Sequence, residues 1–121
     1  MTRSRASAKA AGSRFERLIA DSLAAHIDDR IDRRVTTGAK DKGDIAGVRD
    51  YHGSRIVLEV KDYGGRVDVG TWLRETETER ANDGAIAGAC VFKRRGLTDP
   101  LDQGVLMTVR DLIALLDGER P

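Results

Sequence analysis

The chain has 121 residues, of which 40% are hydrophobic and 34% charged, a balance typical of a folded domain rather than of a disordered chain. Its length suits one domain with a modest core. The longest uncharged stretch, 84–92, is too short for a membrane span, and no apolar segment follows the basic N-terminus as in a secretory signal. The single cysteine, Cys90, excludes an internal disulfide, so we expect a cytoplasmic protein, of a cell or of an infected host.

The basic residues are unevenly distributed, although the net charge is only +1. Three basic blocks alternate with acidic segments, which predicts one cationic side. Such a side is typical of nucleic-acid-binding proteins, but lysines and arginines that only solvate loops would give the same pattern. The residues that we expect to contact nucleic acid are Arg3, Arg5, Lys9, Arg14, Arg30, Arg33, Arg34, Lys40, Lys42 and Lys93.

The N-terminal region divides into an arm and a helix. Residues 1–12 are small, polar and basic, and we expect them to form a flexible arm. Ser13 and Glu16 have the spacing of a capping box, so the first helix is expected to begin at Ser13 and to end near residues 28–30. Apolar residues with helical spacing from Phe15 to Ile27 predict its inward stripe.

The rest of the chain alternates between strand and helix patterns. Apolar runs on either side of a turn predict an antiparallel hairpin, and a helix between two apolar strands predicts a parallel crossover. We therefore expect 13–121 to be one α/β domain in the order α-β-β-β-α-β-β-α. After the first helix, the expected elements are strands at 30–35, 45–48 and 55–60, a helix capped by Asp68, strands at 85–92 and 105–109, and a helix at 111–116.

Charged residues mark one end of the predicted hairpin. Glu59 and Lys61 are two residues apart on a strand and therefore share a face, about 6.5–7 Å apart along the backbone. Asp44 opens the neighbouring strand, so its carboxylate reaches the same end of the sheet. Two carboxylates are suitable ligands for Mg²⁺ or Mn²⁺. A lysine beside them can orient a metal-bound water or neutralise the charge of a phosphoryl transition state. A cross-strand salt bridge with a solvated rim is the alternative interpretation.

Glu16 has two compatible interpretations. It lies on the flank of the apolar stripe of the first helix, where its carboxylate could lean toward Asp44 as a third metal ligand. It also completes the capping box with Ser13. Neither His26 nor His52 has a partner at metal-ligand spacing, so we expect no catalytic histidine.

The order of these residues resembles the PD-(D/E)XK nuclease superfamily. The likeness consists of a helix glutamate, then Gly43-Asp44-Ile45 on one strand and Leu58-Glu59-Val60-Lys61 on the next, followed by a crossover helix and a strand. The opening Gly12-Ser13-Arg14-Phe15-Glu16-Arg17 is similar to archaeal-type Holliday-junction resolvases and their phage-borne relatives. Gly43 stands where the family often has proline.

The resemblance implies a restriction-endonuclease-like mixed β-sheet flanked by helices, with two divalent ions at the hairpin end. Asp44 and Glu59 would hold the metal, Lys61 would position the attacking water, and Glu16 would complete the acidic cluster. Enzymes of this kind hydrolyse phosphodiesters to leave 5′-phosphates, and the resolvases are homodimers that nick two symmetric strands of a four-way junction. The basic residues would then grip DNA backbones without reading sequence.

The function predicted from the sequence is a Mg²⁺- or Mn²⁺-dependent, structure-selective DNA endonuclease, a Holliday-junction resolvase that acts as a homodimer on branched DNA, with no membrane partner. Two alternatives stay open. One is a less selective nuclease that cleaves flaps, single-stranded DNA or RNA. The other is a catalytically silent DNA-binding relative, which would bind no ion at the carboxylates.

Overall fold

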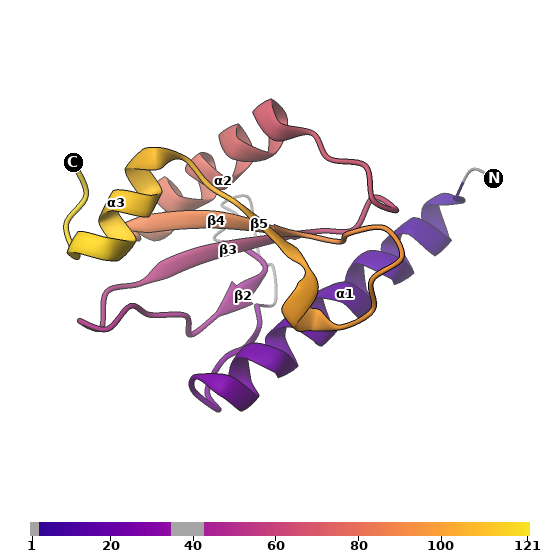
Figure 1. Cartoon of the computed structure of the whole chain (residues 1–121), viewed down its shortest axis with the longest axis horizontal. Helices are drawn as coiled ribbons and strands as arrows, with labels where there is room; N and C mark the ends of the chain where they lie inside the picture. Colours follow the sequence, from indigo (N-terminus) through magenta and orange to yellow (C-terminus); the bar gives the residue numbers. More distant parts are fainter. Residues whose placement is uncertain (1–2, 35–42) are drawn as a thin grey trace.

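The computed structural model describes residues 3–34 and 43–121. Within them the chain forms an α/β fold with a five-stranded mixed sheet and three α-helices (Figure 1). The elements are α1 (Arg5–His26), β1 (Asp32–Arg33), β2 (Ile45–Ala46), β3 (Ile56–Lys61), α2 (Val69–Asp83), β4 (Ala87–Phe92), the 3-10 helix η1 (Pro100–Asp102), β5 (Gly104–Leu106) and α3 (Val109–Asp117).

The strands lie in the order β1-β2-β3-β4-β5 across the sheet. The predicted antiparallel hairpin is present as β2 and β3, with Ile45 opposite Leu58. The predicted parallel crossover is also present, because β3 and β4 run parallel along their whole length and α2 joins them. The edge strands β1 and β5 are antiparallel to their neighbours. The charged end of β3 therefore belongs to a central strand.

The start of α1 corrects the predicted flexible arm. The helix begins at Arg5, and the side chain of Ser4 caps it by accepting a hydrogen bond from the backbone N–H of Ser7. The Ser13–Glu16 capping box is therefore wrong, since both residues lie inside the helix. Four alanines, the residue with the highest helix propensity, lie in the segment that we expected to be flexible.

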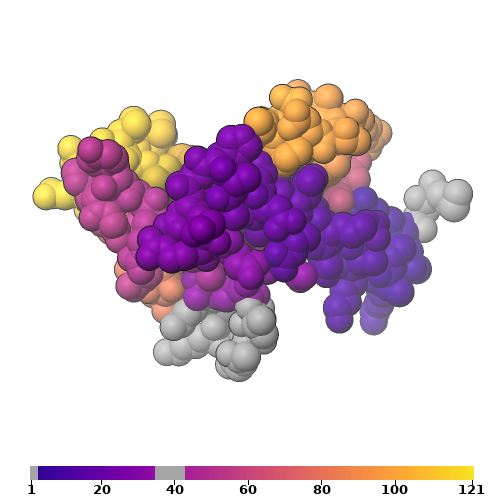
Figure 2. Space-filling model, turned by 90° about the horizontal axis from the view of Figure 1, so that it is seen from below, coloured from indigo at the N-terminus to yellow at the C-terminus, as the bar shows by residue number. Residues whose placement is uncertain are grey.

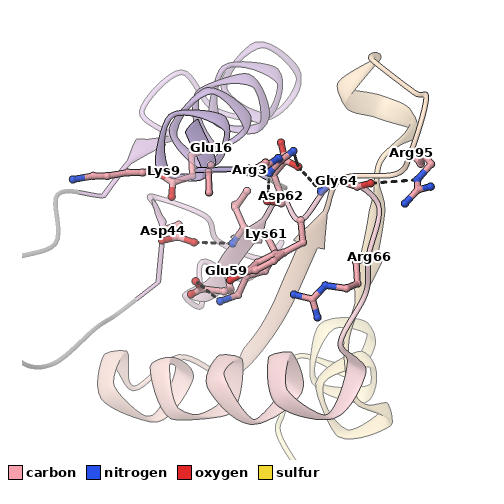
Figure 3. A pocket seen from close by; sticks show the side chains of 14 residues that line it. Arg3, Lys9, Glu16, Asp44, Glu59, Lys61, Asp62, Gly64, Arg66 and Arg95 are labelled. Carbon is pink, nitrogen blue, oxygen red and sulfur yellow. Dashed lines mark hydrogen bonds and ion pairs between the residues drawn. The ribbon is translucent and has the colours of Figure 1, made fainter. Parts of the chain in front are cut away.

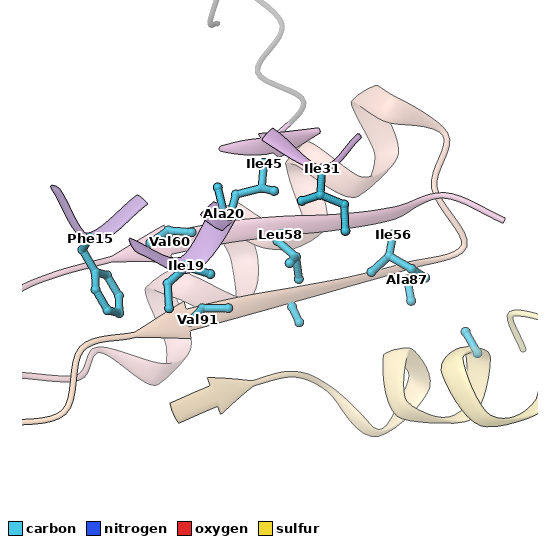
Figure 4. Packing of buried hydrophobic residues seen from close by; sticks show 12 residues of the cluster. Phe15, Ile19, Ala20, Ile31, Ile45, Ile56, Leu58, Val60, Ala87 and Val91 are labelled. Carbon is cyan, nitrogen blue, oxygen red and sulfur yellow. The ribbon is translucent and has the colours of Figure 1, made fainter. Parts of the chain in front are cut away.

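The main core lies between α1 and one face of the sheet (Figure 4). Because side chains alternate along a strand, every second residue of β3 and β4 faces α1. Figure 2 shows α1 running across this side of the molecule, between the hairpin tip in magenta and the segment near residue 100 in orange. The buried residues of this cluster are Phe15, Ile19, Ala20, Ile31, Ile45, Ile56, Leu58, Val60, Ala87, Ala89, Val91 and Ala114.

The opposite face of the sheet is covered by α2 (Figure 1). Asp68 caps this helix as predicted, by accepting a hydrogen bond from the N–H of Thr71. On its side toward the sheet Trp72 and Thr76 are buried, whereas Val69 at its start is half exposed. Glu79 is also buried against the sheet. A charged residue thus occupies a core position beside β3.

None of the described helices is long and apolar enough to cross a membrane. The C-terminal helix α3 packs against β4 through Ala114, and its buried Asp111 accepts a hydrogen bond from the N–H of Gly88. Its outward side is apolar. The exposed side chains there are Val109, Leu112, Ile113 and Leu116.

Candidate functional site

The hairpin register places two carboxyl groups side by side. Asp44 immediately precedes β2, and its backbone N–H donates to the carbonyl of Leu58 at 2.9 Å. One oxygen of its carboxyl group, Oδ2, accepts a hydrogen bond from the N–H of Val60 at 2.7 Å. The Asp44 carboxyl group also interacts with that of Glu59, whose charge contributes to the raised pKa of Asp44. The two acids predicted as metal ligands therefore meet at one end of the sheet.

Burial changes the protonation of both groups. Desolvation, with repulsion from Glu59 as the second cause, raises the pKa of Asp44 to about 8. Desolvation also raises the pKa of Glu59 to about 9, helped by a hydrogen bond with Glu79 on α2. Because both pKa values lie above 7, this carboxyl pair retains protons at neutral pH.

Lys61 lies on the same face of β3 as Glu59, as predicted. Its Nζ is 3.7 Å from Oε1 of Glu59 and 2.5 Å from Oε2 of Glu75. Burial alone would lower the pKa of Lys61, but the hydrogen bond with Glu75 and the nearby carboxylates outweigh it and raise the pKa above its usual value. The ammonium group is therefore charged and held in place at the site.

Two glutamates of α2, which sequence reasoning missed, complete this network. Glu75 is partly exposed and pairs with Lys61, whereas Glu79 is buried and contributes to the raised pKa of Glu59. A signal for Glu79 exists in the sequence, because it lies seven residues after Trp72 and three after Thr76 on the same helical stripe. A glutamate at such a position is a charged residue facing the sheet, which indicates a partner there.

The carboxyl pair and Lys61 line a cavity of about 880 Å³ that opens between the end of β3 and the N-terminal half of α1. Figure 3 shows Asp44, Glu59 and Lys61 in its middle, Lys9 toward one end and Arg95 toward the other. We call the four cationic residues around it the basic rim. The basic rim consists of Arg3, Lys9, Arg66 and Arg95.

The basic rim includes two arginines that were not among the predicted contacts. The guanidinium of Arg66 lies 5.2 Å from the centroid of the Tyr63 ring, and Nε of Arg95 donates to the carbonyl of Gly64. Neither arginine has an ion-pair partner among the described residues. A signal for both exists in the sequence, because Arg66 follows the end of β3 and Arg95 follows the end of β4, the two strands whose ends form the site.

Glu16 reaches the cavity but not the carboxyl pair. It lines the cavity wall from α1, and its charge contributes to the raised pKa of Asp44. Its Oε2, however, accepts hydrogen bonds from Nε and Nη2 of Arg33 at 3.2 and 3.0 Å. The structure therefore places Glu16 at the rim of the site in an ion pair.

The predicted nucleic-acid contacts are divided between several places. Arg3 and Lys9 belong to the basic rim, whereas Arg5 and Arg14 are exposed on α1 outside the cavity. Lys40 and Lys42 lie outside the described residues. Arg3 also pairs with Asp62. The three remaining arginines each pair with an acid: Arg30 with Asp28, Arg33 with Glu16 and Arg34 with Asp83. Lys93 donates hydrogen bonds to the carbonyls of Arg94 and Leu97.

Lys93 makes its contacts within its own loop. Its Nζ is bound to two backbone carbonyls of the loop that follows β4, so it fixes that loop rather than projecting from it. The neighbouring Arg95 lines the cavity instead. The basic block around Lys93 therefore serves partly to hold the loop after β4 in place.

The donor set at the carboxyl pair fits one hard divalent cation. Within the described ranges, no three His, Cys, Asp or Glu side chains are placed for joint coordination. Asp44 and Glu59 nevertheless supply two adjacent carboxylates, and the buried Oε2 of Glu59 has no hydrogen-bond partner among the described residues. Mg²⁺ and Mn²⁺ are commonly held by one or two carboxylates together with waters and substrate phosphate. A cation there would relieve the repulsion within the pair.

Comparison of the chain with protein-family models, with curated proteins and with solved structures gives no match. The geometry of the site is therefore the basis for a functional assignment.

Proposed function

We propose that the protein is a divalent-metal-dependent DNA endonuclease, with the cavity beside Asp44, Glu59 and Lys61 as its active site. The observation that carries this proposal is a buried pair of carboxyl groups, next to a fixed lysine, at the bottom of a cavity with a basic rim. A polyanion is attracted by the rim, and carboxylates are the ligands of the ions that phosphodiester hydrolysis uses. The sequence resemblance to the PD-(D/E)XK superfamily supports the same proposal, and on that ground we also propose a restriction-endonuclease-like fold.

Each residue of the proposed active site would have a separate role. Asp44 and Glu59 would hold the cation, after loss of the protons that the buried pair retains in its absence. When bound, Mg²⁺ or Mn²⁺ supplies Lewis-acid chemistry, which polarises a phosphoryl oxygen. Lys61, held between Glu59 and Glu75, would orient the attacking water and neutralise charge that develops on the phosphoryl group. The residues of the basic rim would hold the phosphates on either side.

Branched DNA, and a four-way junction in particular, is the proposed substrate. The described residues form one small sheet and three helices, without an additional recognition element, so the rim contacts backbone rather than base edges. Backbone contacts select DNA by its shape. A less selective nuclease on flaps, single-stranded DNA or RNA has the same active site, and a cleavage panel of these substrates separates the two.

The decisive experiment combines ion binding and cleavage. Calorimetric titration with Mn²⁺ is expected to show binding to the wild type and no binding to Glu59→Gln. With a labelled immobile four-way junction and Mg²⁺, paired symmetric nicks are expected from the wild type and none from Glu59→Gln or Lys61→Ala. The exposed Glu119, which lies far from the cavity in the chain and does not line it, gives the matched control Glu119→Gln. Wild-type DNA binding without ion binding or cleavage would instead identify a silent DNA-binding relative.

We also propose that the active form is a homodimer joined through the outward side of α3. Val109 and Leu116 are 72% and 79% exposed there, more than isolated apolar side chains in a monomer require. Arg110 and Asp117 lie at opposite ends of this helix, so two antiparallel copies of α3 would bring the arginine of one near the aspartate of the other. Two active sites related by a two-fold axis would match the two-fold symmetry of a four-way junction.

A further inference from the structure

The active-site cavity continues into a second cavity along α1. The second cavity, of about 620 Å³, is lined by residues of α1, by β1 and by Asp44. The two cavities share four lining residues, and we call the combined depression the trench. The shared residues are Lys9, Gly12, Glu16 and Asp44.

The wall of the trench on α1 is made of small side chains. Ala8 and Gly12, one helical turn apart, line the active-site cavity, and Gly12 and Ser13 line the second one. Glycine in a helix interior is destabilising relative to alanine, so its presence at position 12 is not explained by helix formation. A Cβ built on Gly12 meets no atom within 4 Å, so packing within the described residues does not require glycine either.

Charged groups are arranged along the trench so that the carboxyl pair lies between two cationic ends. Arg66 and Arg95 line the end near β4. Arg33 and Arg34 line the end near β1 together with Asp32, and they pair there with Glu16 and Asp83. Between the two ends lies Glu59, whose side chain is 7% exposed and whose buried Oε2 has no hydrogen-bond partner in the described part of the chain. A linear polyanion would place phosphates at both ends and one phosphate at the carboxyl pair.

We propose that the trench seats one polynucleotide backbone, which runs along α1 from Arg66 and Arg95 to Arg33 and Arg34 and passes over Gly12. The proposal rests on the proposed function, which it extends by giving the path of the strand. It assigns to Gly12 and Ala8 the role of keeping the trench open. A bulky side chain at either position would occupy the space of the backbone without changing the charge of the site.

The test is a set of bulky substitutions on α1, with DNA binding measured by fluorescence anisotropy in EDTA, where no cleavage occurs. Gly12→Trp and Ala8→Trp are expected to weaken binding of a labelled four-way junction by about tenfold, similar to the effect of removing one side chain that binds a phosphate. Ala10→Trp is the matched control, because Ala10 is exposed on the same helix and does not line the trench. Gly12→Ala, which adds only a methyl group in open space, is expected to bind as the wild type does.

Three results would overturn the trench path. They are unchanged affinity in Gly12→Trp, an equal loss in Ala10→Trp, and a loss confined to the junction while a labelled single strand binds normally. If such a protein still cleaves junctions with Mg²⁺, the proposed function stands and only the path is wrong. A wild type that neither binds nor cleaves DNA would instead remove the proposed function itself. Thermal unfolding of each variant separates misfolding from loss of binding, and Ala8→Trp provides an independent test should Gly12→Trp unfold.

Discussion

The ammonium nitrogen of Lys61 lies closer to Glu75, on the crossover helix, than to Glu59 on its own strand: 2.5 Å against 3.7 Å. Two carboxylates from different elements thus determine the direction of one lysine. Glu75 is not part of the sequence motif that contains Glu59 and Lys61. Helix α2 therefore participates in the geometry of the site, and does not only cover the sheet.

Removal of Glu75 is expected to impair the chemical step while leaving substrate binding intact. In Glu75→Ala the lysine loses its closest partner, and we expect kcat for junction cleavage to fall about tenfold with little change in KM. Glu75→Gln keeps an acceptor for the ammonium group and is expected to recover part of the rate. A tenfold rise in KM at unchanged kcat would show that Glu75 acts on binding instead, and Glu119→Ala serves as the control.

The stability of the metal-free protein is expected to fall as the pH rises. The ordinary pKa values of Asp44 and Glu59, near 3.8 and 4.5, are raised on folding to about 8 and about 9. Between about pH 4 and pH 9 the folded chain therefore binds more protons than the unfolded chain, and its free energy of unfolding decreases with pH. Urea unfolding in EDTA at several pH values measures this slope.

Glu59→Gln is the matched variant for this prediction, because it removes one of the two titrating carboxyl groups. It is expected to flatten the slope. Excess Mn²⁺ is expected to restore stability at pH 8 in the wild type, since a cation replaces the lost protons. A wild-type free energy of unfolding that rises with pH over this range would contradict the raised pKa values.

The arginines of the basic rim are expected to contribute to the salt dependence of DNA binding. The slope of log affinity against log salt falls by about 0.9 for each phosphate of duplex DNA that the protein no longer neutralises. We expect Arg66→Ala and Arg95→Ala each to lower the slope by this amount, measured by anisotropy between low and moderate salt. Arg49→Ala, at an exposed position of the hairpin that does not line the cavity, is the control. Unchanged slopes in both rim variants would show that DNA binds elsewhere.

Two serine substitutions test where α1 begins. Ser4 caps the helix, so Ser4→Ala is expected to destabilise the protein by about 1 kcal/mol. Ser13 lies inside the helix, where alanine is the better helix former, and Ser13→Ala is expected to cost nothing or to stabilise slightly. Urea unfolding of the two variants gives the answer. The opposite order would restore a helix that begins at Ser13.

Self-association through α3 is expected to depend on Leu116. In Leu116→Glu a charge replaces an apolar side chain that is 79% exposed, and sedimentation is expected to show monomers where the wild type forms dimers. Because the side chain faces away from the sheet, folding should be unaffected. A monomeric wild type at the same concentration would exclude this interface.

Much of the fold follows from local patterns in the sequence. The apolar run in 55–60 and the helical spacing after Asp68 identify β3 and α2, and together they imply the hairpin and the crossover. The prediction for the first turns of α1 was wrong, because Arg5 to Gly12 lacks apolar periodicity. High alanine content and the Ser4 cap are sufficient there to extend a helix that is anchored further along by Phe15.

The centre of the site was predictable because Asp44 and Glu59 are brought together by one hairpin. The rest depends on contacts between elements far apart in the chain. Glu79 approaches Glu59 only because α2 covers that face of the sheet. The pairing of Glu16 with Arg33 depends on how α1 crosses β1. Charge and spacing alone do not determine such partners.

The ion pair between Arg3 and Asp62 has a practical consequence for work with this protein. It ties the residue before the Ser4 cap of α1 to the segment after β3, directly at the cavity. The C-terminus lies at the other end of the longest axis of the molecule (Figure 1). An affinity tag or a fluorophore attached at the C-terminus leaves the cavity mouth clear, whereas the same group attached at the N-terminus would crowd it.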